Sequence, residues 1–358
     1  MLKKILIAGF FLSILAGCMN DDNTTNSETS NSTGINKNEA EIVAENLDVP
    51  WSIEHHNNIF YISERGGTIA QISDGEIERQ SVSLERPLSS TSEAGLLGFI
   101  LHPNFSESKK AFAYYTYEAD NSRMNRIVEL TLSNGHWEET SLLLDDIPSG
   151  STHHGGRIKI GPDEKLYATT GDASEPELAQ SKDSLAGKIL RLNLDGSIPP
   201  DNPFPDSFIY SYGHRNAQGL SWASDETMYA SEHGANANDE INQIEKGKNY
   251  GWPEIEGTQS ETGMESPLFN SGNNNTWAPS GMAYKNQTLF VAALRGNAVL
   301  RFDLDSKEGS QIIDGFGRIR DIHISGDDLY FVTNNKDGRG SPEENDDKLV
   351  RIPLDSID

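Results

Sequence analysis

The stretch LFVAALRGNAVLRFDL, Leu289–Leu304, shows the pattern that decides the fold of this chain. Apolar residues alternate with others over short runs, a turn containing Gly and Asn follows, and a second apolar-rich run completes the unit. Period-two alternation bounded by turn residues is typical of β-strands. We therefore expect this stretch to form a β-hairpin.

Five further stretches repeat the pattern at intervals of roughly 40 to 60 residues. They are IFYISERGGTIAQI from Ile59, FAYYTY with RIVEL from Phe112, LYATTGD with GKILRLNL from Leu166, MYASEHG with EINQI from Met228, and LYFVTNN with KLVRIPL from Leu329. Hairpins too small to bury their own faces pack as blades around a ring. The sequence therefore predicts an all-β fold, a six-bladed β-propeller over residues 41–358. A pair of β-sandwich domains is the alternative, but it does not require six copies of one hairpin.

Composition limits the kinds of partner. The chain has 358 residues, 35% of them hydrophobic, which is enough for a large core. Its formal net charge of -26 argues against a nucleic-acid partner, because binding to phosphates needs clustered Lys and Arg. The same charge is compatible with cation binding.

The N-terminus has the features of an export signal. Lys3 and Lys4 precede an apolar run, Ile5–Ile14, that is short for a membrane span, and the only cysteine, Cys18, follows Leu-Ala-Gly. We expect residues 1–18 to be a bacterial lipoprotein signal with Cys18 lipidated, which would anchor the protein to the outer face of the cell membrane through the lipid alone. An ordinary signal peptide with an incidental Cys is the alternative. Residues 19–40 are polar and predict a flexible tether.

Polar and ionisable side chains that could bind a ligand or transfer a proton cluster next to the repeated strands. In a propeller the loops at these positions converge on a central mouth. The densest stretch is Tyr212–Pro253. His153, beside Gly155 and Gly156, is a candidate general base. His154 is interpreted as a residue that caps a turn.

Two further groups of residues indicate ligand chemistry. Arginines from three units are expected to line the mouth and to bind carboxylates or phosphates: Arg215, Arg295, Arg318 and Arg320. Asp239 and Glu240, near an Asn-Tyr-Gly turn, offer the hard oxygens that Ca²⁺ prefers, although they also fit an exposed acidic loop.

Motifs running in order through most of the chain resemble those of the soluble quinoprotein glucose dehydrogenase and aldose sugar dehydrogenase family. They are PWSIEHHNNIFYISERGGTI, EAGLLGFILHPNF, HHGGRIKIGPDEKLYATTGD, YGHRNAQGL, EHGANANDEINQIEKGKNYGWP, APSGMAY and GRIRDIHISGDDLYFVTNN. The resemblance implies a six-bladed propeller with pyrroloquinoline quinone (PQQ) and Ca²⁺ at the central mouth. It also implies oxidation of the anomeric hydroxyl of an aldose to a lactone.

The resemblance assigns roles to individual residues. His153 matches the catalytic base, and Arg215 with Asn216 matches an Arg-Asn pair that contacts the quinone. Arg318 and Arg320 match the pair that binds the PQQ carboxylates. Four positions match calcium sites: Glu240 and the Tyr250 carbonyl at one, and the Gly234 and Ala235 carbonyls at the calcium that touches the cofactor.

Two positions depart from the family pattern. Glu93 stands where a cofactor-binding Gln is usual, and Arg295 stands where a PQQ-binding Lys is usual. A carboxylate facing a tricarboxylate would be repulsive unless it is protonated or paired. A calcium-stabilised binding propeller without PQQ chemistry is therefore the alternative function, and a lactonase-like hydrolase is a third. The sequence leaves open which aldose is used, what accepts the electrons, and whether the chain forms a homodimer.

Overall fold

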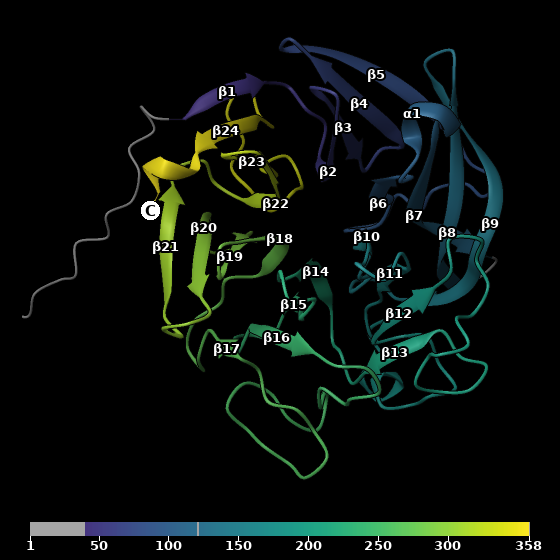
Figure 1. Ribbon diagram of the computed structural model, residues 1–358, viewed down its shortest axis with the longest axis vertical. Helices are drawn as coiled ribbons and strands as arrows, with labels where there is room; N and C mark the ends of the chain where they lie inside the picture. The colour runs from purple at the N-terminus through teal and green to yellow at the C-terminus, as the bar shows by residue number, and fades with distance from the viewer. Residues whose placement is uncertain (1–39, 120–121, 358) are drawn as a thin grey trace, which may run out of the picture. The chain divides into compact units, whose positions relative to one another are not determined.

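The computed structural model describes residues 40–119 and 122–357, which are almost entirely β-structure (Figure 1). The expected signal and most of the tether lie outside these residues. Short helices are α1 (Phe105–Ser108) and the 3₁₀ turns η2 (Pro176–Ala179) and η3 (Leu354–Ser356). Within the described ranges, no helix is long and apolar enough to cross a membrane.

Four sheets each contain four antiparallel strands. The first comprises β10 (Ile158–Ile160), β11 (Leu166–Thr169), β12 (Lys188–Leu192) and β13 (Ile209–Tyr212). The second comprises β14 (Ala217–Trp222), β15 (Met228–Glu232), β16 (Glu240–Ile244) and β17 (Phe269–Asn270). The third comprises β18 (Pro279–Lys285), β19 (Thr288–Ala293), β20 (Ala298–Asp303) and β21 (Gly309–Asp314). The fourth comprises β22 (Ile319–Ser325), β23 (Asp328–Thr333), β24 (Leu349–Pro353) and β1 (Glu41–Ala44).

The fifth sheet has eight strands and consists of two four-stranded halves. One half is β2 (Pro50–His56), β3 (Ile59–Glu64), β4 (Thr68–Ser73) and β5 (Glu76–Ser83). The other is β6 (Leu96–Leu101), β7 (Lys110–Ala119), β8 (Ser122–Ser133) and β9 (His136–Ser149). Among the described residues, the backbone pairing between the halves is a three-residue parallel ladder of β5 with β9, whereas the other pairings in the sheet are antiparallel.

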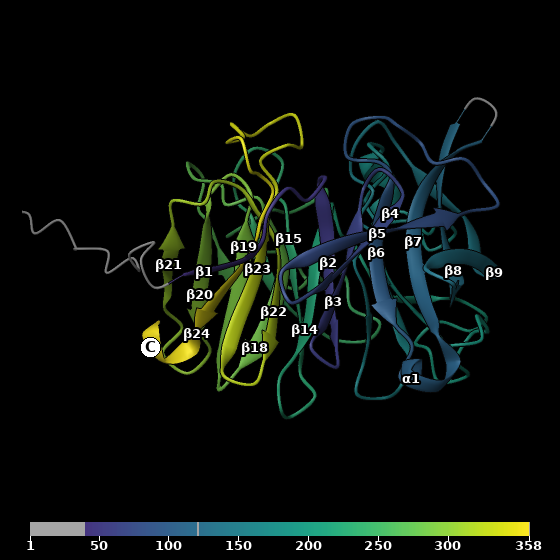
Figure 2. The ribbon, with the colours of Figure 1, turned by 90° about the horizontal axis from the view of Figure 1, so that it is seen from above.

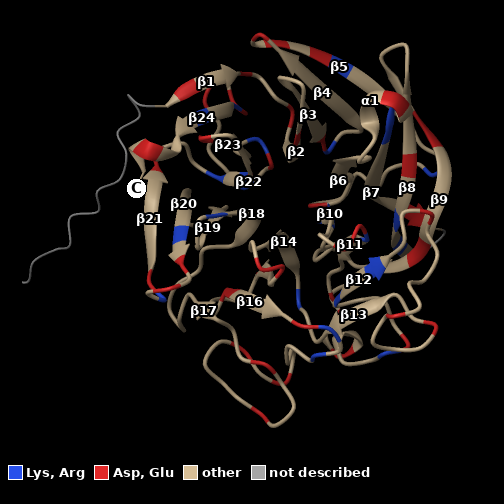
Figure 3. Cartoon of the chain, viewed as in Figure 1, with Lys and Arg blue, Asp and Glu red and all other residues tan. Residues whose placement is uncertain are grey.

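The repeated hairpins predicted from the sequence are confirmed as antiparallel strand pairs. In chain order they are β3–β4, β7–β8, β11–β12, β15–β16, β19–β20 and β23–β24. The sheets follow one another around a common centre, as a β-propeller requires (Figures 1 and 2). Acidic residues are spread around this ring rather than gathered in one place (Figure 3).

Apolar clusters hold the ring together. One cluster lies between each pair of neighbouring sheets, and another lies between the two halves of the eight-stranded sheet. The first strands of neighbouring sheets approach closely because glycine has no side chain. A Cβ at Gly219 would lie 2.3 Å from the Ser280 carbonyl oxygen, and one at Gly281 would lie 1.6 Å from Oδ1 of Asp321. The close approach brings the loops at one end of these strands together.

Candidate active site

His153 lies in the loop between β9 and β10, and the surrounding contacts fix its imidazole. Its Nδ1 is 2.8 Å from Oδ1 of Asp172, and its Nε2 is 3.0 Å from NH2 of Arg215. A carboxylate oxygen only accepts and a guanidinium only donates, so the proton is on Nδ1 and the lone pair is on Nε2. The side chain is 20% exposed, so a ligand can reach it.

Asp172 was not singled out in the sequence, although it ends the quoted motif LYATTGD. Its Oδ1 also accepts from the backbone N–H of Ser174 at 2.9 Å, and its Oδ2 accepts from Nε1 of Trp252 at 2.9 Å. The preceding Gly171 makes the contact possible, because a Cβ there would lie 1.8 Å from the carbonyl oxygen of His153. The sequence feature that could have pointed to Asp172 is the Thr-Gly-Asp turn after a repeated strand.

Arg215 and Asn216 reach the same loop from the stretch before β14. The Arg215 guanidinium donates from NH1 to the His233 carbonyl at 3.3 Å and lies 5.3 Å from the centre of the Trp252 ring. Oδ1 of Asn216 accepts from the backbone N–H of Gly155 at 3.1 Å. Asn216 therefore holds the loop that carries His153, while Arg215 contacts His153 directly.

Arg318 and Arg320, on either side of the first residue of β22, are both buried but differ in their partners. Arg318 binds Oδ2 of Asp337 through Nε at 3.0 Å and NH2 at 2.7 Å. Arg320 donates from NH1 to the neutral Oε1 of Gln218 at 2.8 Å, and its buried Nε has no partner among the described residues. Burial lowers the pKa of Arg320 to about 9. Arg320 therefore lacks the anion that such a buried cation needs.

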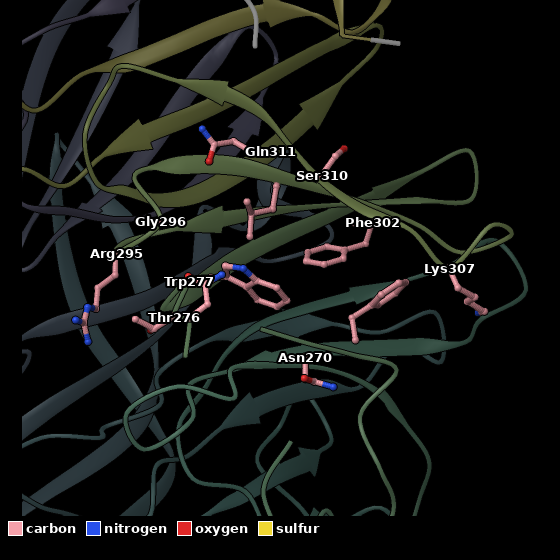
Figure 4. Close-up of a pocket in the computed structure, with 13 residues that line it drawn as sticks. Asn270, Thr276, Trp277, Arg295, Gly296, Phe302, Lys307, Ser310 and Gln311 are labelled. Atoms are coloured by element: carbon pink, nitrogen blue, oxygen red, sulfur yellow. The ribbon is translucent and has the colours of Figure 1, made fainter. Parts of the chain in front are cut away.

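Arg295 is not brought into this group. It follows β19, is exposed, and lines a separate cavity of about 680 Å³ between the sheets of β17 and β21. Figure 4 shows Trp277 and Phe302 beside one another there, with the Arg295 side chain directed away from both. The sequence placed Arg295 with the other arginines because its loop position is equivalent, but side-chain direction was not visible in the pattern.

Glu93 lies beside His153 and is ion-paired. One carboxylate oxygen accepts from NH1 of Arg339, and the other accepts from the backbone N–H of His153 at 3.3 Å. Burial alone would raise the pKa of Glu93, but the charge and hydrogen bond of Arg339 outweigh it and lower the pKa to about 2. The repulsion expected for a carboxylate at this position is therefore relieved by a residue that the sequence analysis did not select.

Arg65 is a second residue that the sequence analysis missed. It follows β3, is only partly exposed, and its buried Nε has no partner among the described residues. Burial lowers its pKa, while Asp337 and Glu93 oppose the shift. Arg65 and Arg339 stand after and before repeated strands, but so do many surface arginines, so pattern alone could not select them.

The positions expected to bind calcium fall into two neighbouring groups. Glu240 accepts from the backbone N–H of Gly257 at 2.8 Å and from Nδ2 of Asn242 at 3.1 Å. Burial, then the nearby Glu232 carboxylate, raises the pKa of Glu240 to about 8. Tyr250 stacks on His214, whose Nδ1 is 2.8 Å from Glu232, so Tyr250 belongs to the same cluster.

The second group follows β15. The backbone N–H of Gly234 donates to Oδ1 of Asp239, and that of Ala235 donates to Oε1 of Glu256, both at 2.9 Å. Oδ2 of Asp239 accepts from Thr276, Trp277 and Ala278, so this carboxylate serves the loop rather than an ion. In the part of the chain described, no three His, Cys, Asp or Glu side chains group as metal ligands.

His154 is buried and lines the same small cavity as Glu93 and Arg320. Its Nδ1 is 2.6 Å from the Ser149 hydroxyl, and its Nε2 is 3.3 Å from the Ser92 carbonyl, which only accepts, so Nε2 carries a proton. Burial lowers its pKa. His154 therefore holds two loops together, whereas the His153 side chain contacts Asp172 and Arg215 and is 20% exposed.

Known proteins resemble this chain over most of its length. A model of the glucose / sorbosone dehydrogenase family matches residues 47–350. Aldose sugar dehydrogenase YliI of Escherichia coli is 30% identical over 349 residues, which are 83% of this chain and 90% of that protein. Quinoprotein glucose dehydrogenase B of Acinetobacter calcoaceticus is 33% identical over 267 residues, which are 65% of this chain and 56% of that protein.

A solved structure shares the fold closely. The PQQ-bound form of the aldose sugar dehydrogenase from Streptomyces coelicolor superimposes with a TM-score of 0.82 at 35% identity, covering 88% of this chain and 97% of that one. Because the family match spans nearly all the described strands, the chain belongs to the glucose / sorbosone dehydrogenase family.

Proposed function

We propose that this protein is a PQQ-dependent dehydrogenase that oxidises the anomeric hydroxyl of an aldose to a lactone. The observation that carries the proposal is the hydrogen-bonded series Asp172, His153 and Arg215 at a ligand-accessible position. The family membership and the PQQ-bound relative support the cofactor and the substrate class.

The chain's own residues account for proton removal. Asp172 holds the Nδ1–H tautomer, so the Nε2 lone pair is available to take the proton of a sugar hydroxyl. The buried Asp172 carboxylate then stabilises the imidazolium that forms. Arg215, which now donates to Nε2, can donate instead to an oxygen on which negative charge develops.

The cationic mouth fits a polycarboxylate cofactor. In the part of the chain that the structure describes, Arg320 and Arg65 each bury a guanidinium Nε without an acceptor, and a carboxylate would satisfy such groups. Arg318 and Arg320 would bind the PQQ carboxylates, and Arg215 with Asn216 would lie near the quinone. When bound, PQQ would supply the acceptor for the hydride, which carries both electrons away from the sugar. Arg295 is retained as a cofactor contact only if its side chain turns from its present direction.

Calcium binding fits the acidic cluster. The raised pKa of Glu240 reflects a buried carboxylate beside Glu232 without a cation, and Ca²⁺ would relieve that repulsion. Glu240 and the Tyr250 carbonyl would hold one ion. The Gly234 and Ala235 carbonyls would hold another near the cofactor.

The remaining parts of the proposal concern architecture and location. Because the eight-stranded sheet joins through only three parallel residue pairs and has an apolar cluster between its halves, we count it as two blades, which gives six. Export, with lipidation at Cys18, follows from the N-terminal sequence.

The test is reconstitution with PQQ and Ca²⁺, followed by aldose-dependent dye reduction. The wild type is expected to reduce the dye, and His153→Gln is expected to lose about 10²- to 10⁴-fold in kcat while still binding PQQ. If the protein binds PQQ but no aldose causes dye reduction, the proposed dehydrogenase activity is refuted. That result would favour the calcium-stabilised binding propeller, against which the Asp172–His153 pair now argues.

A further inference from the structure

The arginines of the mouth are partly neutralised by the protein itself. Glu93 forms an ion pair with Arg339, and Asp337 forms one with Arg318. Arg320 and Arg65 have no carboxylate bound to their guanidinium groups among the residues that the structure describes. The mouth therefore contains two internal carboxylates and at least two cationic groups that still need an anion.

The two internal pairs differ in how firmly they are held. The Asp337 side chain is 3% exposed and also accepts from the backbone N–H of Arg339 at 2.8 Å. The Arg339 side chain is 50% exposed and lies in the segment between β23 and β24, and its guanidinium has one other hydrogen bond among the described residues, to Ser92 at 3.5 Å. An exposed guanidinium on a loop can leave its partner at little cost. The Glu93–Arg339 pair is therefore the exchangeable one.

The space beside this pair is too small for a ligand. A cavity of about 20 Å³ lies among Trp51, Gln218, His233 and Arg320, and Glu93 and Arg339 also line it. That is room for about one water molecule. A larger molecule can enter this cavity only if some of the side chains that line it move.

We propose that Arg339 binds a carboxylate of the molecule that enters the mouth, and that Glu93 is a built-in competitor that occupies Arg339 until this carboxylate replaces it. This inference rests on the proposed function for its ligand. The carboxylate comes either from the cofactor or from an acidic sugar, and the chemistry of recognition is the same.

Glu93 also contacts the loop that carries His153, so exchange at Arg339 could affect that loop. Glu93 accepts from the His153 backbone N–H, and His153 has a φ of 62°, in the left-handed region that is uncommon for non-glycine residues. Arg339 binds Oε1 of Glu93 and the His153 N–H binds Oε2, so the second contact does not depend on the first. Exchange at Arg339 therefore does not require the His153 loop to move.

The experiment measures PQQ binding by absorbance titration in Ca²⁺ without sugar, for the wild type, Glu93→Gln, Arg339→Gln and the double variant. Glu93→Gln is expected to tighten binding about fivefold and Arg339→Gln to weaken it about fivefold, as expected for a partly exposed charge pair. In the double variant, the gain from Glu93→Gln is expected to disappear, because the competitor acts only through Arg339. Asp328→Asn is the matched control, since it removes a carboxylate paired with Arg351 at the opposite end of β23.

Two further measurements distinguish a carboxylate of the cofactor from a carboxylate of the sugar. Benzene-1,3,5-tricarboxylate, titrated into the same variants, is a planar tricarboxylate without quinone chemistry. In the loaded enzyme, KM for glucuronate relative to glucose reports a sugar carboxylate. If Glu93→Gln improves PQQ binding, the carboxylate is the cofactor's; if it leaves PQQ binding unchanged and lowers KM for glucuronate only, it is the sugar's.

The outcomes distinguish this inference from the proposed function. Equal PQQ affinity and equal KM ratios in all variants would overturn the role of Arg339 and leave the dehydrogenase intact. Absence of PQQ binding to the wild type would overturn the dehydrogenase. The tricarboxylate would then decide Arg339 alone: the fivefold pattern supports its role, and equal affinities overturn it.

Discussion

Two buried arginines, Arg126 on β8 and Arg320 on β22, show how structural and ligand-binding cations differ. Arg126 lies 2.8 Å from Glu139, 3.3 Å from Glu85 and 3.7 Å from Asp145. Burial would lower its pKa, but Tyr115 and these carboxylates outweigh burial and raise it. For Arg320, burial lowers the pKa to about 9, and the neighbouring Arg318, Arg65 and Arg157 lower it further while Asp337 opposes them. No carboxylate among the described residues binds its guanidinium. A cation that serves the fold brings its own anions, whereas a cation that serves a ligand leaves that place open.

Removing Arg126 is expected to have the largest effect on stability. Arg126→Met would leave Glu139, 2% exposed, as an unpaired buried carboxylate, so the free energy of unfolding should fall by about 3–5 kcal/mol. Denaturant unfolding measures this loss, and Arg126→Met with Glu139→Gln should recover part of it. A loss below about 1 kcal/mol would contradict the interpretation of Arg126 as a cation that stabilises the fold.

Arg320→Met should act on binding instead. Removing a charged hydrogen-bond donor from the cofactor carboxylate should weaken PQQ about 100-fold. The free energy of unfolding without cofactor should stay the same or rise, because an uncompensated buried charge is gone. Titration and denaturation of the same preparations provide the check; destabilisation as large as that of Arg126→Met would contradict it.

The pH dependence of stability should separate wild type from Arg320→Met. Since the pKa of Arg320 is about 9 in the folded protein and 12.5 ordinarily, the folded protein holds fewer protons than the unfolded chain between these values. Wild-type stability should therefore rise relative to the variant above pH 9, while the cost of the charge is fully present below it. Unfolding midpoints of both proteins at pH 7, 9 and 10 test this, and a constant difference would refute the shift.

Arg351 should give the smallest effect. It pairs with Asp328 at 2.9 Å and Glu41 at 2.7 Å, but its side chain is 38% exposed. Arg351→Gln should lower the free energy of unfolding by less than about 1 kcal/mol, with the loss decreasing in high salt. A loss matching that of Arg126→Met would mean that pairing, rather than burial, decides the cost.

Local pattern was sufficient for the strands but not for the partners within the site. Period-two alternation located the repeated hairpins, and the Gly-Gly after His153 drew attention to its loop. Asp172 could not be chosen over other acidic turn residues, because its contact with His153 depends on the packing of Gly171. Arg339 stands 246 residues from Glu93, so no local pattern links them. Arg295 shows the converse, since an equivalent loop position did not give an equivalent side-chain direction.

The last sheet is completed by strands from both ends of the domain. Strand β1 pairs with β24, and Glu41 and Arg351, which face each other there, are 310 residues apart in the sequence. A contact across so long a span carries a high loop-closure entropy and is expected to form late in folding. Until β24 has been synthesised, β1 remains an unpaired edge strand. Closure of the ring therefore requires the complete chain. A chain that ends before Leu349 is expected to leave strands with unpaired edges and to be cleaved more readily by proteases.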